Sequence, residues 1–284
     1  MREQKNRIAQ EMHRNHANTD FEFVTVNKNG NVPFTGIRLD RGVISPVVYY
    51  EPDDAVEDIM ERIQYALEQD NPEFDMNVLH DPDYILNHTY TGIQKKSNED
   101  IVKKDCLNLE VFLKLQVDLG SDKGTMKINE TLLTMNDLDS KDVWNHAIEN
   151  SVSQFEIKTL EDVLGMPKGM MSAPFDVVVA KADSSVDGAA ALFFPELFWG
   201  YTHDAKRTEI ILIPSSREEL LIVRDGMLED SGRDFQNLAR MVKDINNTCV
   251  SPDIALEPVI YNYELMTGKI TIAGSACETE SGVA

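Results

Sequence analysis

Residues 107–119 read LNLEVFLKLQVDL, and apolar and polar side chains alternate along almost the whole stretch. Every odd-numbered position is leucine or valine, and every even-numbered one except Phe112 is polar. Successive side chains of a β-strand point to opposite faces of its sheet. The stretch therefore predicts a long strand with one buried and one solvent-facing side, which is typical of an antiparallel sheet.

Shorter strands are expected before this one, at residues 21–26, 32–39 and 43–50, with a hairpin turn at Asn29-Gly30. The clearest helix is expected over residues 54–69, where apolar side chains recur every three or four positions. Asp54 and Glu57 have the spacing of a capping box at its start. Further helices are expected at 82–90, 97–104 and 140–151, and a returning strand at 125–129.

The Gly-, Pro- and Met-rich stretch 165–174 is the candidate boundary between two lobes. After it we expect strands at 175–180, 209–213, 220–224, 259–264 and 269–272, and helices at 188–199 and 233–246. This β-α-β-β-α-β order is similar to a split βαβ unit.

The sequence thus predicts an α+β fold of antiparallel sheets with packed helices, in two loosely defined lobes. The expected divisions are an N-terminal extension at 1–19, a lobe at 20–164, a linker at 165–174, a lobe at 175–273 and a flexible tail at 274–284.

Composition excludes several classes of function. The 284 residues carry a formal net charge of −22, which opposes direct binding to nucleic acid or to an anionic membrane. The three cysteines form no C-x-x-C pair, and the N-terminus lacks the apolar core of a secretory signal. A cytoplasmic location is therefore expected, with no membrane association, no metal site and no cofactor.

A search for catalytic motifs finds no phosphate-binding loop, dinucleotide turn, zinc-protease helix or nucleophile elbow. The loop 214–219 offers Ser215, Ser216, Arg217 and Glu219 between two apolar strands. One interpretation is a hydrolase or transferase site there, but a nucleophilic serine needs a base, and no histidine lies nearby in the sequence. The favoured interpretation is a polar connection, because Pro and Ser are common in turns.

Acidic residues are concentrated in residues 51–83, where Arg62 is the only base. The expected helix within this block would present acids to solvent; the candidate partner-binding residues are Asp54, Glu57, Asp58, Glu61 and Glu68. A solvated acidic face that keeps the protein soluble is one interpretation. The other is a surface that attracts a basic partner protein.

Several short stretches together resemble a known family. They include Val26 to Asn29, Ile44-Ser45-Pro46, Asp187 to Leu192, Ile213 to Ser216, and Tyr261-Asn262-Tyr263. In this order they resemble the bacterial family named domain of unknown function 5688, which is common in gut Firmicutes. The family pattern has Ile-His-Glu after Pro-Ser-Ser, whereas this chain has Arg217-Glu218-Glu219, so no role for a histidine carries over.

The resemblance implies no known activity, but the family's occurrence on phages and conjugative elements favours a role in interaction with a host. We therefore expect a non-enzymatic, acidic protein-binding factor, for example a mobile-element inhibitor of a host nucleic-acid-binding or defence protein. The alternatives are a hydrolase or transferase at the 214–219 loop, and a structural or regulatory module. The sequence does not specify the oligomeric state.

Overall fold

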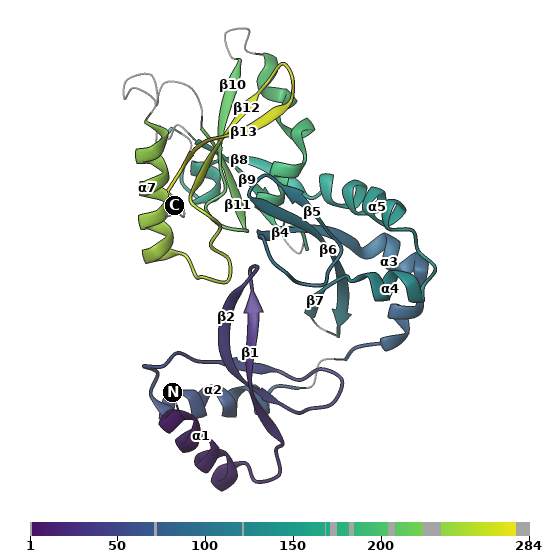
Figure 1. Ribbon diagram of the computed structural model, residues 1–284, viewed down its shortest axis with the longest axis vertical. Helices are drawn as coiled ribbons and strands as arrows, with labels where there is room; N and C mark the ends of the chain where they lie inside the picture. The colour runs from purple at the N-terminus through teal and green to yellow at the C-terminus, as the bar shows by residue number, and fades with distance from the viewer. Residues whose placement is uncertain are drawn as a thin grey trace, which may run out of the picture. The chain divides into compact units, whose positions relative to one another are not determined.

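The computed structural model describes residues 2–70, 73–120, 122–167, 169–170, 175–181, 185–203, 208–223 and 234–276. The chain forms two compact units (Figure 1). The first holds Met1–Met76 and Val117–Gly124, and the second holds Asn77–Gln116 and Thr125–Ala284. The expected boundary at 165–174 does not coincide with this division, because residues on both sides of it belong to the second unit. Part of that stretch lies outside the described residues.

The first unit contains two helices and a three-stranded antiparallel sheet in the order β1-β2-β3. Its elements are α1 (Arg2–Asn15), β1 (Phe21–Lys28), β2 (Val32–Leu39), β3 (Val47–Tyr49) and α2 (Val56–Glu68). The turn between β1 and β2 has positive φ at Asn29 (44°) and Gly30 (81°). These angles fit the tight hairpin turn that an Asn-Gly pair favours.

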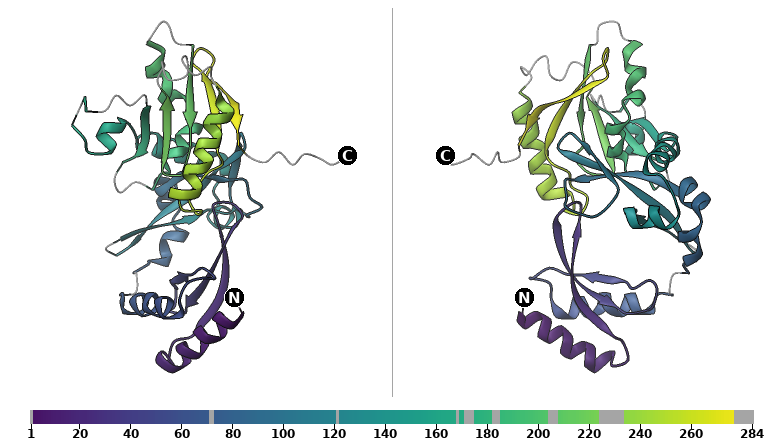
Figure 2. Two further views of the ribbon diagram at one scale, coloured as in Figure 1. Left: turned by 90° about the vertical axis from the view of Figure 1, so that its left-hand side faces the viewer. Right: turned by 45° about the vertical axis from the view of Figure 1, so that its right-hand side comes forward.

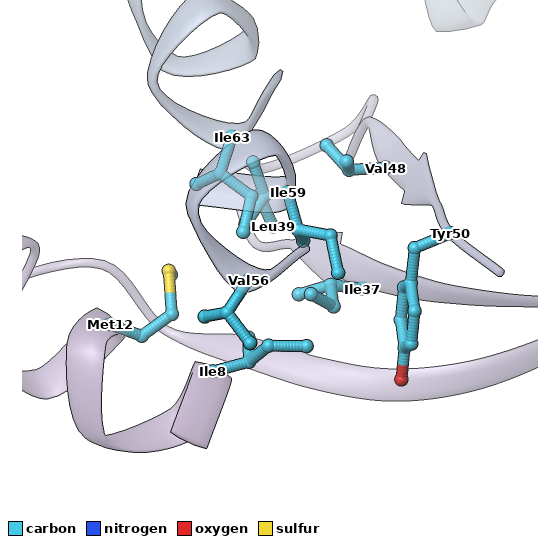
Figure 3. Close-up of a cluster of buried hydrophobic side chains, with 9 residues drawn as sticks. All are labelled: Ile8, Met12, Ile37, Leu39, Val48, Tyr50, Val56, Ile59 and Ile63. Carbon is cyan, nitrogen blue, oxygen red and sulfur yellow. The ribbon is translucent and has the colours of Figure 1, made fainter. Parts of the chain in front are cut away.

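The core of this unit joins both helices to the sheet. Ile8 and Met12 of α1 are fully buried beside Ile59 and Ile63 of α2 (Figure 3). The first nineteen residues are therefore not an extension outside the fold, because α1 supplies part of the core. Leu67 is only partly buried against the same cluster.

Asp54 does not form the expected capping box at the start of α2. The helix begins after Ala55, whose side chain cannot cap it. The Asp54 carboxylate instead binds Arg62 and the backbone N–H of Glu51. The helix itself lies where its apolar periodicity places it.

The first sheet of the second unit is built on the stretch that shows the alternation. It holds β4 (Thr89–Lys95), β5 (Lys103–Cys106), β6 (Leu109–Leu119) and β7 (Asp122–Lys127), of which only Val117–Gly124, at the end of the β6–β7 pair, is grouped with the first unit. Strand β6 pairs with the other three. Helices α3 (Pro82–His88), α4 (Glu130–Met135) and α5 (Ser140–Val152) belong with it, and a short 3-10 turn covers Met76–His80. In Figure 1, α3 and α5 lie together beside this sheet.

Two expectations about this region are wrong. Residues 97–104 form no helix, since 103–106 are strand β5 and the preceding residues are irregular. Strand β6 is not buried on one side only, because every residue from Leu109 to Val117 is buried. Its polar residues therefore lie inside the protein.

The second sheet has six strands in the order β13-β12-β10-β11-β9-β8, all paired antiparallel. The elements are β8 (Phe155–Thr159), α6 (Leu160–Val163), β9 (Phe175–Ala180), β10 (Glu209–Ile213), β11 (Glu219–Val223), α7 (Phe235–Cys249), β12 (Val259–Glu264) and β13 (Lys269–Ser275). Helix α7 packs on one face through Ala239 and Val242 (Figure 2). Strands β9 and β10 run parallel with β11 between them, and β11 and β12 run parallel with β10 between them, so the antiparallel sheet agrees with the expected split βαβ arrangement.

The segment expected as a helix at 188–199 is two 3-10 helices, η2 (Gly188–Phe193) and η3 (Pro195–His203). It packs on the sheet face opposite α7, where Phe198 meets Tyr263 with ring centroids 5.3 Å apart. The three alanines at 189–191 are fully buried. Residues 274 and 275, expected in a flexible tail, belong to β13.

Candidate functional site

The polar face of β6 is the most unusual feature of the second unit. Glu110, Lys114 and Gln116 are 2%, 6% and 7% exposed. Charged residues are almost never buried unless they are paired. Each of these side chains has a partner, and those of Lys114 and Gln116 come from distant parts of the sequence.

Lys114 belongs to a buried ionic cluster with Asp187 and Arg217. Lys114 Nζ donates to Asp187 Oδ1 at 2.7 Å, and Arg217 donates from Nε and Nη2 to Asp187 Oδ2 at 3.2 and 2.9 Å. The backbone N–H of Ile93 donates to the same Oδ2 at 2.9 Å. The cluster therefore holds two cations around one carboxylate.

Asp187 also covers the open edge of β4. This strand pairs only with β6 among the described strands, so its outward backbone N–H groups need other acceptors. Ile93 N donates to Asp187, and Thr91 N donates to Ser151 Oγ of α5 at 3.0 Å. The backbone N–H groups of Ile93 and Thr91 at this edge thus bond to side chains rather than to another strand.

Two glycines leave room for close contacts around the cluster, Gly188 for a backbone and Gly92 for side chains. A Cβ on Gly188 would lie 2.0 Å from the carbonyl oxygen of Glu218, and one on Gly92 would lie 2.6 Å from Phe112 Cζ. The backbone N–H of Ala189 donates to the Arg217 carbonyl at 3.0 Å. The start of η2 and the 214–219 loop are therefore held in direct contact.

A second polar network lies further along the same face of β6. Glu110 accepts hydrogen bonds from Gln94 Nε2 at 2.7 Å and Ser97 Oγ at 2.6 Å, and it pairs with Lys103 at 3.2 Å. Lys127 pairs with Glu99 and donates to Gln94. The two acids and two lysines of this network balance in charge.

The protonation of both clusters follows from their partners. Burial alone raises the pKa of Asp187, but the charges of Lys114 and Arg217 outweigh it and hold the pKa below its ordinary value. Burial also raises the pKa of Glu110, whereas its hydrogen bonds, led by those from Ser97 and Gln94, lower the pKa below the ordinary value. Both carboxylates are therefore charged at neutral pH.

The serines of the 214–219 loop have structural partners. Ser216 is 4% exposed, and its Oγ accepts the backbone N–H of Glu218 at 3.2 Å. Ser215 Oγ donates to Glu219 Oε1 at 3.2 Å. Among the described residues no histidine bonds to either hydroxyl. The structure thus brings together Ser215 with Glu219, while Arg217 points to Asp187 instead.

The candidate acids of α2 lie where its helical pattern places them. Glu57, Asp58, Glu61 and Glu68 are exposed, and Asp54 is half-buried. Arg7 of α1 approaches Glu57 at 3.4 Å, and Gln64 donates to Glu68 at 2.5 Å. The outer face of α2 keeps most of its negative charge.

The described ranges were also searched for metal sites, membrane-spanning helices and reactive cysteines. No group of His, Cys, Asp and Glu in them could hold a metal ion. No helix among them is long and apolar enough to cross a bilayer. Burial raises the pKa of Cys106 to about 11, so this cysteine is a thiol at neutral pH and a poor nucleophile.

Sequence reasoning missed Lys114 and Asp187 as site residues. The alternation placed Lys114 on a solvent face, and Asp187 has the position of a helix cap although its side chain caps nothing. The alternation carries no signal for this cluster, because the residues that cover the second face of β6 lie far away in the sequence.

Comparisons with other proteins give one positive result. Neither the curated proteins nor the solved structures contain a match to the chain. A family model matches residues 1–265. The chain belongs to the family of unknown function DUF5688.

Proposed function

We propose that the protein is a non-enzymatic binding factor whose acidic α2 face docks on a basic partner protein in the cytoplasm. The observation that supports this proposal is the division of α2 into two sides. Ile59 and Ile63 are fully buried, while Glu57, Asp58, Glu61 and Glu68 face solvent. Exposed acids attract a cationic surface and speed its encounter.

The net charge of −22 limits the kind of partner. It repels a phosphate backbone, so the proposal includes no direct contact with nucleic acid. A host protein that itself binds nucleic acid, or a defence protein with a basic groove, has the complementary charge. In this proposal the chain of a mobile element or phage occupies that groove and inhibits the host protein.

The 214–219 loop gives less support to a hydrolase or transferase. The Ser216 hydroxyl is buried and already accepts a backbone hydrogen bond, and Ser215 is bonded to a carboxylate. Neither has a described base of the kind that activates a serine. For this reason the binding function is preferred.

The test starts with affinity purification from the native host and identification of the captured proteins by mass spectrometry. The purified partner is then titrated at several salt concentrations with the wild type and with a variant that carries Glu57→Gln, Asp58→Asn, Glu61→Gln and Glu68→Gln. Binding should weaken in this variant and depend less on salt, because each exposed charge is screened over a Debye length of about 10 Å at 0.1 M salt.

A charge-matched control removes exposed acids of the second unit, through Asp105→Asn, Asp142→Asn, Glu149→Gln and Asp244→Asn. The control should bind as the wild type does. Equal affinities and equal salt slopes for all three proteins would refute the α2 interface. They would leave its acids as a device for solubility.

A further inference from the structure

A cavity of about 440 Å³ lies beside the C-terminal half of α7. All of its lining residues belong to the second unit. Its apolar wall includes Val250, Ala255 and Leu256, of which the last two are buried. This volume is within the range of small-molecule sites, about 300–1,000 Å³.

Positive charge predominates on the polar wall of this cavity. Lys95 and Lys243 line it, and Glu257 is the only acid among the lining residues. The Glu257 carboxylate accepts a hydrogen bond from Asn108 at 2.5 Å. The hydrogen bond that Lys243 Nζ donates, to the Ala276 carbonyl, is long at 3.5 Å. The Lys243 ammonium is therefore available to an anion.

Asn246 adds a fixed polar group to the same wall. Its Nδ2 donates to the carbonyls of Ser215 at 3.0 Å and Leu256 at 3.1 Å, which sets the orientation of the amide. Asn246 is 7% exposed, and its Oδ1 accepts no hydrogen bond from the described residues. This oxygen is also shielded from solvent, so the amide fixes the shape of the wall but offers the cavity no accessible acceptor.

We propose that the cavity binds a small organic carboxylate that carries an apolar body. The Lys243 ammonium attracts the carboxylate, and the apolar wall takes the body. A leucine-like amino acid with an acylated nitrogen has these two features, and so does the apolar C-terminal residue of a peptide. This site is independent of the proposed α2 interface.

The probe is N-acetyl-leucine, titrated into the full chain at millimolar concentration and followed by NMR shifts of the protein backbone. Shifts should be concentrated at residues 246–258. N-acetyl-leucinamide, which lacks the charge, should bind at least about fivefold more weakly. A peptide that ends in leucine tests the source of the carboxylate. Tighter binding of the peptide supports a chain terminus, and weaker binding supports a free acid.

Lys243→Gln should weaken N-acetyl-leucine about fivefold, the effect of one partly exposed charge pair. Lys269→Gln is the matched control, because it removes an exposed lysine of β13 in the same unit that does not line the cavity. Thermal melts check that both variants fold. No shifts in the wild type, equal binding of the amide, or undiminished binding by Lys243→Gln would each overturn the proposal.

Discussion

Arg217 donates two hydrogen bonds, from Nε and Nη2, to a single carboxylate oxygen of Asp187, although the two residues are thirty positions apart. The other carboxylate oxygen binds Lys114. This arrangement ties the 214–219 loop and the start of η2 to the first sheet of the second unit. Because the two cations share one counter-charge, we expect replacement of Asp187 to affect stability differently from replacement of either cation.

Asp187→Asn should be strongly destabilising. The amide keeps the size of the side chain but leaves the buried Lys114 and the partly buried Arg217 without a counter-charge. Removal of one partner from a buried pair costs about 3–5 kcal/mol. The free energy of unfolding from urea melts measures the loss. Asp105→Asn is the control, because Asp105 pairs with Lys96 at an exposed site, and its change should stay within about 0.5 kcal/mol.

Lys114→Met should cost less than half as much as Asp187→Asn. Methionine fills the space of the lysine stem, and the remaining Arg217–Asp187 pair is balanced in charge. Replacement of a buried charge by an apolar residue of similar volume is often close to neutral. Urea melts of both variants measure the two losses in the free energy of unfolding. Equal losses for the two variants would show that the cluster does not carry excess positive charge.

The loss of folding stability at acid pH should depend on Asp187. Because its pKa is lower in the folded protein than in the unfolded chain, the unfolded chain takes up the proton first as the pH falls. The stabilisation is complete above the ordinary pKa of about 3.9 and is lost below it. Melts between about pH 5 and about pH 3 should show a steeper loss in the wild type than in Asp187→Asn. Parallel curves would contradict the assignment.

Gly188→Ala should destabilise the second unit, because the new Cβ would lie 2.0 Å from the Glu218 carbonyl oxygen. Backbone atoms must move to admit it, at a cost of about 1–3 kcal/mol or more. Gly200→Ala is the control, since nothing lies within 4 Å of its Cβ position. Thermal melts compare the two variants. Similar midpoints would mean that the loop and η2 are not in close contact.

The local sequence pattern was sufficient to predict most of the strands. The periodicity at 209–213 and 259–264 predicted β10 and β12 with their observed bounds, and the apolar face of α2 is where its 3–4 spacing puts it. These features depend on side-chain spacing within one element. The Asn-Gly turn after β1 depends equally on local conformation.

The ionic cluster could not be predicted in this way. Whether Lys114 is exposed depends on what covers the second face of β6, and that cover comes from residues 187 and 217. The run of small residues at 188–191 has good helix formers in it, yet it forms a 3-10 helix, because tertiary packing overrides propensity. Distant contacts of this kind leave no periodic trace in a single sequence.

The two serines of the 214–219 loop should respond differently to substitution. Ser216→Ala removes the acceptor of the part-buried hydrogen bond from the Glu218 N–H, so a loss of about 1 kcal/mol is expected. This loss is larger than the change in stability expected for a substitution in an exposed polar turn. Ser215→Ala removes only a part-exposed bond to Glu219 and should stay within about 0.5 kcal/mol.

Urea melts of the two single variants measure these losses, and a fluorophosphonate probe tests for nucleophilic character in the wild type. Neither serine should be labelled, because among the described residues no histidine bonds to either hydroxyl to activate it. Ser216 is moreover almost inaccessible, at 4% exposure. Labelling that disappears in Ser215→Ala or Ser216→Ala would overturn the structural role of that serine. It would also restore the hydrolase or transferase interpretation, since the probe reacts only with an activated hydroxyl.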